Sequence, residues 1–376
     1  MREWSRPTIH TTTGHRQASW IELFFDLVFI ASLVETIHFV ETHLSEGIMS
    51  TLLFFLVFFI APWIVWRSTT FYSDRYEENT SRHRLLLIVL MIPIGLFAYS
   101  VHHVVEGHVG WFVLSFLLSR LWLLFMWGSV RMTEEAQKRT FRILLIGHGT
   151  AILLVSLSYW FTFLPLVLLA LVIELFQTLW TLRAHEQLPE LTRNHLPERF
   201  GLFTMLILGE GVLGVIDLLA TGDGLLLPFL LFLYLVCCFW IYYDQVIYRL
   251  YHPTAWHVYW WGMWNLGIVS SLLLVRSAFA GYASDDPEAI LLFFSATLLF
   301  IWTTGGIGLT GQKDTVSLRM TRRFLQLRLL LTLLLIGSFF LFTPIVLLLM
   351  MLLSLLLILL QGMYYWTTHL RPSSEI

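Results

Sequence analysis

Long apolar runs alternate with short polar segments along the chain, and most runs hold about 20 residues. A helix needs about 20 apolar residues to cross a hydrocarbon core of roughly 30 Å. The pattern therefore predicts an all-α integral membrane protein with about twelve transmembrane helices. We predict these spans at residues 20–40, 48–68, 84–103, 109–130, 141–160, 163–183, 199–219, 225–248, 257–280, 288–309, 324–341 and 344–366.

The basic side chains fall on alternate loops. The chain has 23 Lys and Arg, and all but Arg120 and Arg276 lie in the tails, in every second loop or at the end of a span. Because cations are enriched in segments that stay in the cytoplasm, we expect a multi-pass protein of the cell inner (plasma) membrane with both termini cytoplasmic. The polar segment 1–19 does not have the form of a cleavable signal peptide, so we expect the first apolar run to remain as the first helix.

The two halves of the chain resemble each other at an offset of about 176 to 179 residues, since Glu22 corresponds to Glu198 and Trp63 to Trp240. Six spans in each half would place the halves in the same orientation, as in transporters built from parallel repeats. The alternative is chance similarity between Leu- and Phe-rich segments. The expected parts are a cytoplasmic N-tail (1–19), a first six-helix half (20–183), a cytoplasmic linker (184–198), a second six-helix half (199–366) and a cytoplasmic C-tail (367–376).

Composition excludes several classes of function. The net charge is only −2 and no basic block interleaves with aromatic residues, so we expect no nucleic-acid partner. Cys237 and Cys238 are adjacent within one apolar run, where we expect core packing rather than a disulfide. Because no HExxH, P-loop, GxSxG or thiolate ligand set is present, we expect no cofactor, no metal and no enzymatic activity. Histidines near the outer ends of the spans leave a weak metal site open as an alternative.

Acidic residues inside the first predicted span carry the clearest chemical signal. A lone ionised group near the bilayer centre costs at least about 2.5 to 3.5 kcal/mol unless it is paired or faces a cavity. Glu22 and Asp26 are four residues apart, which puts both carboxylates on one face of a helix. One interpretation is structural, since acids near a helix N-terminus interact favourably with the helix dipole and with nearby arginines. The other is a proton or cation site.

The seventh predicted span also contains acidic residues within an apolar run. Its opening segment includes Glu198 and Arg199, and Glu210 follows twelve residues later with Gly209 and Gly211 on either side. Twelve helical residues rise about 18 Å, so we expect Glu198 at the inner surface and Glu210 past the midplane. Small neighbours permit a close helix approach or local unwinding beside a cavity. A functional Glu210 and a Glu210 that only holds helices together both fit this pattern.

Two arginines interrupt the apolar runs. Arg120 lies at the middle of its span and Arg276 near the outer end of another. An arginine stays charged in a protein and therefore needs a carboxylate neighbour when it is buried. We expect Arg120 to pair with Glu174 or Glu210, at a polar cavity between the two halves. The alternative is that a closed ion pair only locks the bundle.

The charged motifs together resemble a known family. The segments Glu22–Phe29 and His195–Phe203, followed by Gly209 and Glu210, are similar to signatures of the bacterial low temperature requirement protein A family. The segment from Trp240 to Asp244, with His257 beyond it, resembles the family's next stretch. The family pattern usually has a small or aliphatic residue in place of Pro197, a Ser in place of Gly211, and an acidic pair in place of Asn79 and Thr80. The resemblance implies an integral membrane protein whose family name records a cold-growth phenotype, and it supplies no substrate.

We therefore expect a secondary transporter or channel that uses intramembrane carboxylates. The expected partners are the lipid bilayer and a small solute or ion, with protons a leading candidate, and an oligomer stays open. The alternative is a structural or regulatory membrane protein that supports growth at low temperature, with the charges acting as interhelical locks. A membrane enzyme is a third class. The residues expected to form the site are Glu22, Asp26, Arg120, Glu174, Glu198, Arg199, Glu210, Asp244, His257 and Arg276.

Overall fold

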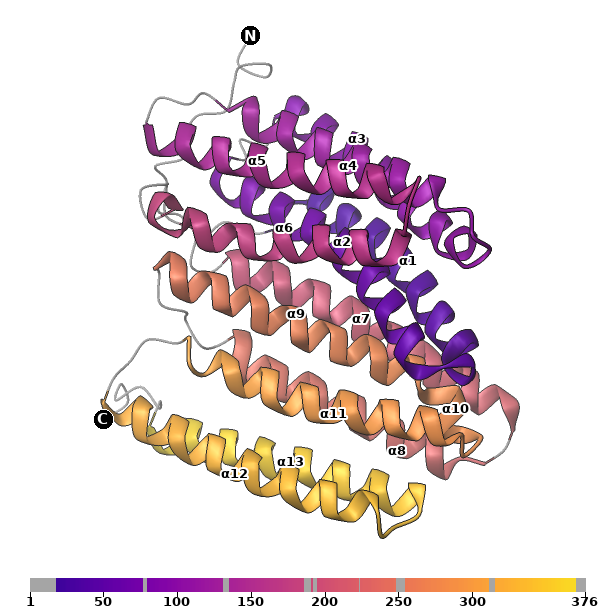
Figure 1. The fold of residues 1–376 in the computed structure, drawn as a ribbon. Helices are drawn as coiled ribbons and strands as arrows, with labels where there is room; N and C mark the ends of the chain where they lie inside the picture. The colour runs from indigo at the N-terminus through magenta and orange to yellow at the C-terminus, as the bar shows by residue number, and fades with distance from the viewer. Residues whose placement is uncertain are drawn as a thin grey trace. The chain divides into compact units, whose positions relative to one another are not determined.

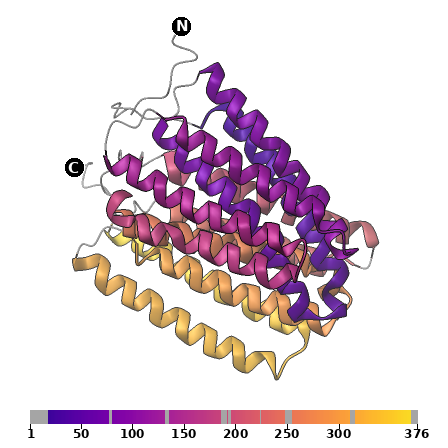
Figure 2. The same ribbon diagram turned by 45° about the horizontal axis from the view of Figure 1, so that its top comes forward.

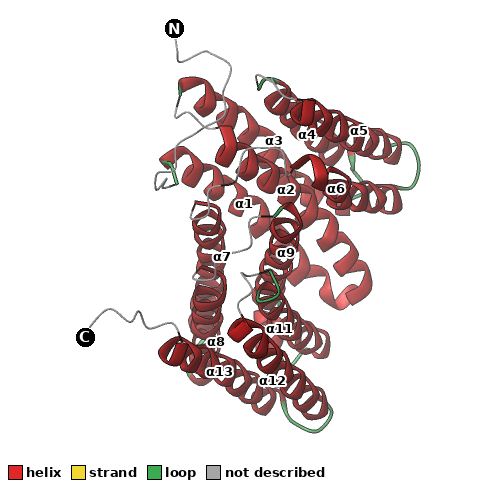
Figure 3. Ribbon diagram, turned by 90° about the vertical axis from the view of Figure 1, so that its left-hand side faces the viewer, coloured by secondary structure: helices red, strands yellow, loops and turns green. Residues whose placement is uncertain are grey.

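The structure is a computed structural model of the 376-residue chain. It describes residues 18–76, 80–130, 135–185, 191, 195–222, 224–247, 254–310 and 315–369. Every regular element among these residues is a helix, as Figure 3 shows. The predicted all-α class is therefore confirmed for the described part of the chain.

The chain divides into two compact units. One comprises Met1–Phe200 and Pro253–Tyr259, and the other comprises Gly201–His252 and Trp260–Ile376. The expected division into repeated halves with a linker at 184–198 stays a prediction, and most of that linker lies outside the described residues. The first unit contains α1 (Trp20–His43), the 3-10 helix η2 (Leu44–Glu46), α2 (Ile48–Tyr76), α3 (Ser81–Val105), α4 (Gly110–Gly128), α5 (Glu135–Ser158) and α6 (Phe163–His185), shown in Figure 1.

Two helices begin in the first unit and continue in the second, namely α7 (His195–Thr221) and α9 (Ala255–Ser277). The other elements belong to the second unit alone. They are α8 (Leu226–Tyr242), the π-helix η3 (Tyr243–Ile247), α10 (Phe279–Ala283), α11 (Pro287–Ile307), α12 (Thr315–Phe339) and α13 (Pro344–His369).

Local sequence explains where several helices begin. Ser19 precedes α1 and forms a capping box with Glu22, whose Oε2 accepts a hydrogen bond from the Ser19 main-chain N–H at 2.9 Å. Thr80 caps α3 through its hydroxyl oxygen, and Asp286 caps α11 just before Pro287. These side chains bind main-chain groups that a helix end leaves without partners. The polar segments between the apolar runs therefore fix the helix starts.

Each of the twelve predicted spans coincides with a long helix. Ten helices of the described chain are both long and apolar enough to cross a membrane. The described part of α6 includes a shorter apolar stretch, Phe163–Gln177, and α12 carries Arg319, Arg322, Arg323 and Arg328. The protein is thus a multi-pass membrane protein, whereas twelve crossings remain a prediction. The span expected at 257–280 is interrupted, because α9 ends at Ser277 and the short helix α10 follows.

Large apolar side chains are exposed along the helices of both units, among them Leu121, Ile146, Leu213 and Leu333. An exposed apolar surface of this extent marks an interaction with another apolar phase. In a multi-pass membrane protein that phase is the hydrocarbon core of the bilayer. The helices therefore contact lipid.

In the first unit, aromatic rings pack the region where α2 meets the start of α7. The Trp63 and Trp66 rings lie 5.1 Å apart between centroids, and the Phe200 ring meets Trp66 edge-on at 4.7 Å. All three side chains are at most 1% exposed. This packing holds the first turn of α7 against the core of the unit. Elsewhere in the unit α5 packs along α6, as Figures 1 and 2 show.

In the second unit, small residues bring α9 and α11 close together. A Cβ atom added at Gly306 would lie 2.4 Å from the indole ring of Trp264, and one added at Gly267 would lie 2.4 Å from Thr303 Cγ2. Both distances are far below van der Waals contact. These glycines are therefore required by the close approach of the two helices.

Candidate functional site

The first unit contains two clusters of buried charged side chains. We call one the acid cluster, which consists of Glu22, Asp26, Asp74, His195 and Arg199. We call the other the Arg120 triad, which consists of Arg120, His148 and Glu174. All eight side chains are at most 4% exposed.

The acid cluster is built on the first turns of α1. Glu22 and Asp26 are one helical turn apart and share a face, as their spacing predicts, and both are 0% exposed. Arg199 on α7 joins them, because its NH1 donates to Glu22 Oε1 at 2.5 Å and its NH2 donates to Asp26 Oδ1 at 2.8 Å. One guanidinium therefore bridges two carboxylates. Both acids of α1 are thus paired with a cation inside the unit.

The two oxygens of Asp26 have different surroundings. Oδ1 accepts from Arg199 and also from the indole Nε1 of Trp66 at 2.8 Å. Oδ2 is buried and receives no hydrogen bond from any residue that the structure describes. A buried polar atom is ordinarily paired with protein or with ordered water. Oδ2 is thus the position in the cluster at which a proton or a small cation would find a partner.

A histidine extends the cluster. His195 Nδ1 lies 2.7 Å from Asp74 Oδ1 at the end of α2, and its Nε2 lies 3.6 Å from Glu22 Oε2. A carboxylate oxygen accepts hydrogen bonds, so in this pair the imidazole donates through Nδ1 to Asp74 Oδ1. Three carboxylates in the cluster share one guanidinium and one imidazole. Such a group can take up protons while its members remain hydrogen-bonded to one another.

The Arg120 triad lies near the middle of α4, α5 and α6. Arg120 Nε donates to Glu174 Oε1 at 2.8 Å, and its NH2 donates to Glu174 Oε2 at 2.6 Å. NH2 also donates to the main-chain oxygen of Ala61 at 3.1 Å, and the guanidinium lies 4.1 Å from the centroid of the Phe116 ring. His148 Nδ1 completes the triad at 2.7 Å from Glu174 Oε1.

The expected partner of Arg120 is therefore present, and it is Glu174 rather than Glu210. The planar guanidinium meets the carboxylate in the bidentate geometry that distinguishes arginine from lysine. His148 was missed as a member, because its span was expected to begin at residue 141. Since α5 begins at Glu135, His148 is carried about four turns into the helix. The polar cavity expected beside the pair stays a prediction.

Arg276 and Glu210 meet in the second unit in an unexpected way. Arg276 Nε donates to the main-chain oxygen of Glu210 at 3.1 Å, and its NH2 lies 3.4 Å from Asp217 Oδ2. A Cβ atom at Gly214 would lie 2.4 Å from Arg276 Nε, so the guanidinium rests against the bare main chain of α7. Gly214 makes room for this contact. The Glu210 side chain itself is half-buried.

The remaining predicted site residues lie elsewhere. Glu198 is half-buried in the first turn of α7. Asp244 is half-buried in the π-helix η3, and His257 Nδ1 lies 2.6 Å from the Thr254 hydroxyl at the start of α9. A π-turn inside an α-helix often marks a functional position. The roles of these three residues stay predictions.

The burial of one arginine was not expected from the sequence. Arg328 was placed at the inner end of a span, yet its side chain is 2% exposed. Its NH2 donates to Gln245 Oε1 at 2.6 Å, and its Cδ would lie 2.9 Å from a Cβ atom at Gly305. Because several arginines precede it at the start of α12, Arg328 was expected among the cations at the end of the span. Its position inside the unit depends on packing that the sequence alone does not reveal.

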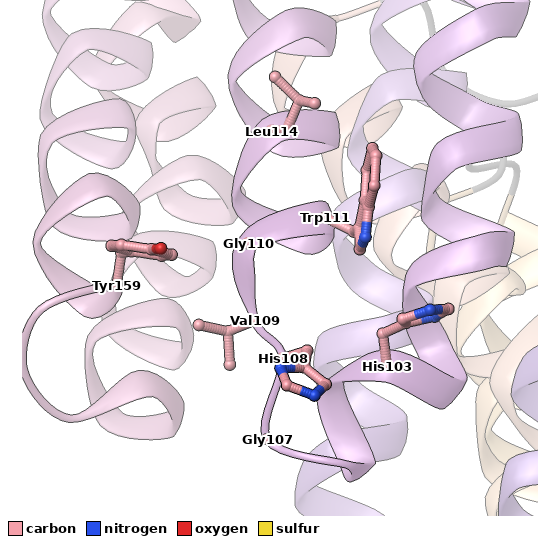
Figure 4. A pocket seen from close by; sticks show the side chains of 8 residues that line it. All are labelled: His103, Gly107, His108, Val109, Gly110, Trp111, Leu114 and Tyr159. Carbon is pink, nitrogen blue, oxygen red and sulfur yellow. The ribbon is translucent and has the colours of Figure 1, made fainter.

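An open pocket of about 810 Å³ lies where the α3–α4 turn meets the end of α5, as Figure 4 shows. His103, His108, Trp111 and Tyr159 line it, together with four smaller or apolar residues. None of the predicted site residues lines this pocket. Two imidazoles alone make a poor metal site, and among the described residues no group of three or more potential metal ligands occurs.

Comparison with known proteins places this architecture in a family. An uncharacterized protein of Rhizobium meliloti (strain 1021), RA0937, is 30% identical over 256 residues, which cover 62% of this chain. The match covers 60% of that protein, so the chain spans about three fifths of the length of this curated relative. Residues 17–363, which include both buried clusters, match the family described as bacterial low temperature requirement A protein. The chain therefore belongs to the bacterial low temperature requirement A protein family.

Proposed function

We propose that this protein is a secondary transporter or channel of the bacterial inner membrane in which the acid cluster binds and releases a proton or a small cation. The proposal includes twelve crossings with both tails in the cytoplasm, as the alternation of basic loops indicates. It gives the protein a transport role rather than an enzymatic one. The two-repeat design belongs to the same proposal, although its support is the sequence offset alone.

The environment of Asp26 Oδ2 is the main support for a proton or cation site. An ionised carboxylate that is removed from water requires compensation at both oxygens, and only Oδ1 receives hydrogen bonds from the described residues. A proton on Oδ2 would neutralise the carboxylate, and a small cation at Oδ2 would supply the missing partner. Either event uses an atom that the fold leaves available inside the unit.

Arg199 explains how occupation of Asp26 affects the helices. The guanidinium divides its donors between Glu22 and Asp26, so the pair competes for a single cation. Neutralising Asp26 weakens one half of the bridge and leaves Arg199 bound to Glu22. Because Arg199 lies on α7 and both acids lie on α1, this exchange changes the strength of the contact between two helices. Population shifts in transporters arise from such differential contacts.

The second candidate function is structural. Glu22 already serves in the capping box of α1 and binds Arg199, so the acid cluster also locks α1 to α7 and α2. A buried ion pair is weak evidence of function by itself. Under this hypothesis the protein supports growth in the cold as a structural or regulatory component, and proton binding at Asp26 has no role.

The experiment that separates the two replaces Asp26 with asparagine, which keeps the shape and the Oδ1 acceptor but removes the charge. We expect Asp26→Asn to fold and insert, yet to lose the growth at low temperature that the wild-type chain restores to a strain lacking its own copy. The exposed Glu46→Gln serves as the matched control and should retain this growth. Melting temperature in detergent is measured in parallel. If Asp26→Asn unfolds many degrees earlier and growth follows the amount of folded protein, the structural interpretation is correct and the transport proposal is wrong.

A further inference from the structure

The face of α5 that packs against α6 carries a line of buried polar side chains. Thr140 and His148 are eight residues apart on this face, which corresponds to about 12 Å along the helix. Gln177 projects from α6 toward Gly147, since its Oε1 would lie 1.8 Å from a Cβ atom built there. Thr140 and His148 are each 2% exposed, and Gln177 is 3% exposed. The polar line therefore runs from the N-terminal part of α5 to the Arg120 triad.

Each of these three side chains has an atom without a hydrogen-bond partner among the described residues. The atoms are Thr140 Oγ1, Gln177 Oε1 and His148 Nε2. Buried side-chain polar atoms are ordinarily satisfied by protein or by ordered water. Three such atoms along one helix interface point to a hydrogen-bonded path rather than to three separate defects.

The chemistry of His148 follows from its partner. Glu174 holds Arg120 through both oxygens, so it is ionised and can only accept a hydrogen bond. The proton of the neutral imidazole is therefore on Nδ1, where it is donated to Glu174 Oε1 at 2.7 Å. Nε2 keeps a free lone pair at the end of the polar line. It is the basic nitrogen of the triad.

We propose that His148 is an internal proton-binding site, reached from the N-terminal end of α5 along the Thr140–Gln177 side of the α5–α6 interface through ordered water. The arriving proton forms a bond to Nε2, the imidazole becomes imidazolium, and the Nδ1–H bond to Glu174 remains. Release is the reverse step, so no oxidant, reductant or second reactant is required. This site is separate from Asp26, and the inference does not depend on the function proposed for the acid cluster.

The charges around His148 allow both protonation states. With a neutral imidazole, Arg120 and Glu174 compensate each other. With an imidazolium, Glu174 lies between two cations and the triad carries one net positive charge. Arg67 on α2 is a further buried cation, and it interacts electrostatically with Glu174. Within the triad the proton exchange is thus assigned to His148, whereas the guanidinium of Arg120 stays protonated throughout.

Nitrogen NMR of the full-length protein in lipid bilayers tests the proton site directly. His148–Gly149 is the only His–Gly dipeptide among the 14 histidines, so selective labelling of that pair identifies the His148 ring without a variant. We expect the Nε2 resonance to move from the unprotonated to the protonated range when the protein is acidified. An Nε2 resonance that stays unchanged on acidification would show that His148 is only a structural hydrogen-bond donor, and the proposal would be overturned.

Thiol accessibility tests the path. Thr140→Cys and Val155→Cys are prepared in a background without Cys237 and Cys238, and both positions lie on the buried face of α5 on opposite sides of His148. A small water-soluble thiol reagent modifies only an ionised thiol, which requires water. We expect modification of Thr140→Cys and none of Val155→Cys. Equal protection of both cysteines would contradict a hydrated path, and equal modification would show general opening of the helix pair instead.

Discussion

Removing the guanidinium of Arg120 should destabilise the protein far more than removing an exposed ion pair of the same length. Arg120 and Glu174 approach to 2.6 Å with both side chains 0% exposed. Arg142 and Glu135 approach to the same 2.6 Å, but their side chains are 64% and 74% exposed. The two pairs therefore differ in burial and not in distance. Comparing them shows the combined effect of burial and of the larger number of hydrogen bonds that Arg120 makes.

The magnitude follows from what Arg120→Leu leaves behind. Glu174 would lose three hydrogen bonds from the guanidinium and keep only His148. Removing one partner of a buried ion pair typically costs about 3 to 5 kcal/mol, because the other charge is left uncompensated. We expect a value near the lower limit, since Glu174 keeps its hydrogen bond from His148. The exposed control Glu135→Gln should change stability by about 0 to 1 kcal/mol.

A double-mutant cycle distinguishes lost charge compensation from simple loss of packing. The free energy of unfolding is measured in a bilayer-like environment by steric trapping for Arg120→Leu, Glu174→Leu and the double variant. We expect the double variant to be more stable than either single variant, because no charge remains uncompensated. Additive losses in the double variant would refute the reasoning. So would an Arg120→Leu effect as small as that of the exposed control.

Two further predictions concern the glycines of α7 and the topology. Gly214→Ala should destabilise the protein by about 1 to 3 kcal/mol in the same unfolding assay, because the added Cβ would displace Arg276. Gly209→Ala is the control, since no atom lies within 4 Å of its added Cβ, and it should be neutral or slightly stabilising. Equal effects of the two substitutions would contradict the close contact between Gly214 and Arg276. Cysteines placed at Glu46 and Asp285 should react with an impermeant reagent outside intact cells, whereas tags on both termini should be protected. External reactivity of both tails would overturn the predicted orientation.

The sequence predicts the helices well because the length of an apolar run is a local property. The sequence predicts local helix geometry less well where tertiary packing determines it. The π-helix at Tyr243–Ile247 and the break between α9 and α10 leave no signal in hydropathy, because both depend on how neighbouring helices pack. The early start of α5 at Glu135 was also missed, since charged residues at a helix start resemble a loop.

The candidate site shows the same limit. Spacing alone places Glu22 and Asp26 on one face, and the rule that a buried arginine needs an acid leads from Arg120 to Glu174. The contacts of Asp26 with Trp66 and of His195 with Asp74 and Glu22 could not be predicted, because each joins residues that are far apart in the sequence. A charged residue within an apolar span indicates that a partner of opposite charge is needed, whereas the fold determines which residue is that partner.

Proton uptake by the purified full-length protein shows directly whether Asp26 exchanges a proton, because the measurement requires no knowledge of the transported solute. Wild type and Asp26→Asn are acidified in weakly buffered solution, and a pH-indicator dye reports the protons bound by each molecule. We expect the variant to take up about one proton fewer than the wild type while remaining folded. Equal uptake by the two proteins would show that Asp26 does not exchange a proton, and would contradict the assignment of the acid cluster as a proton site.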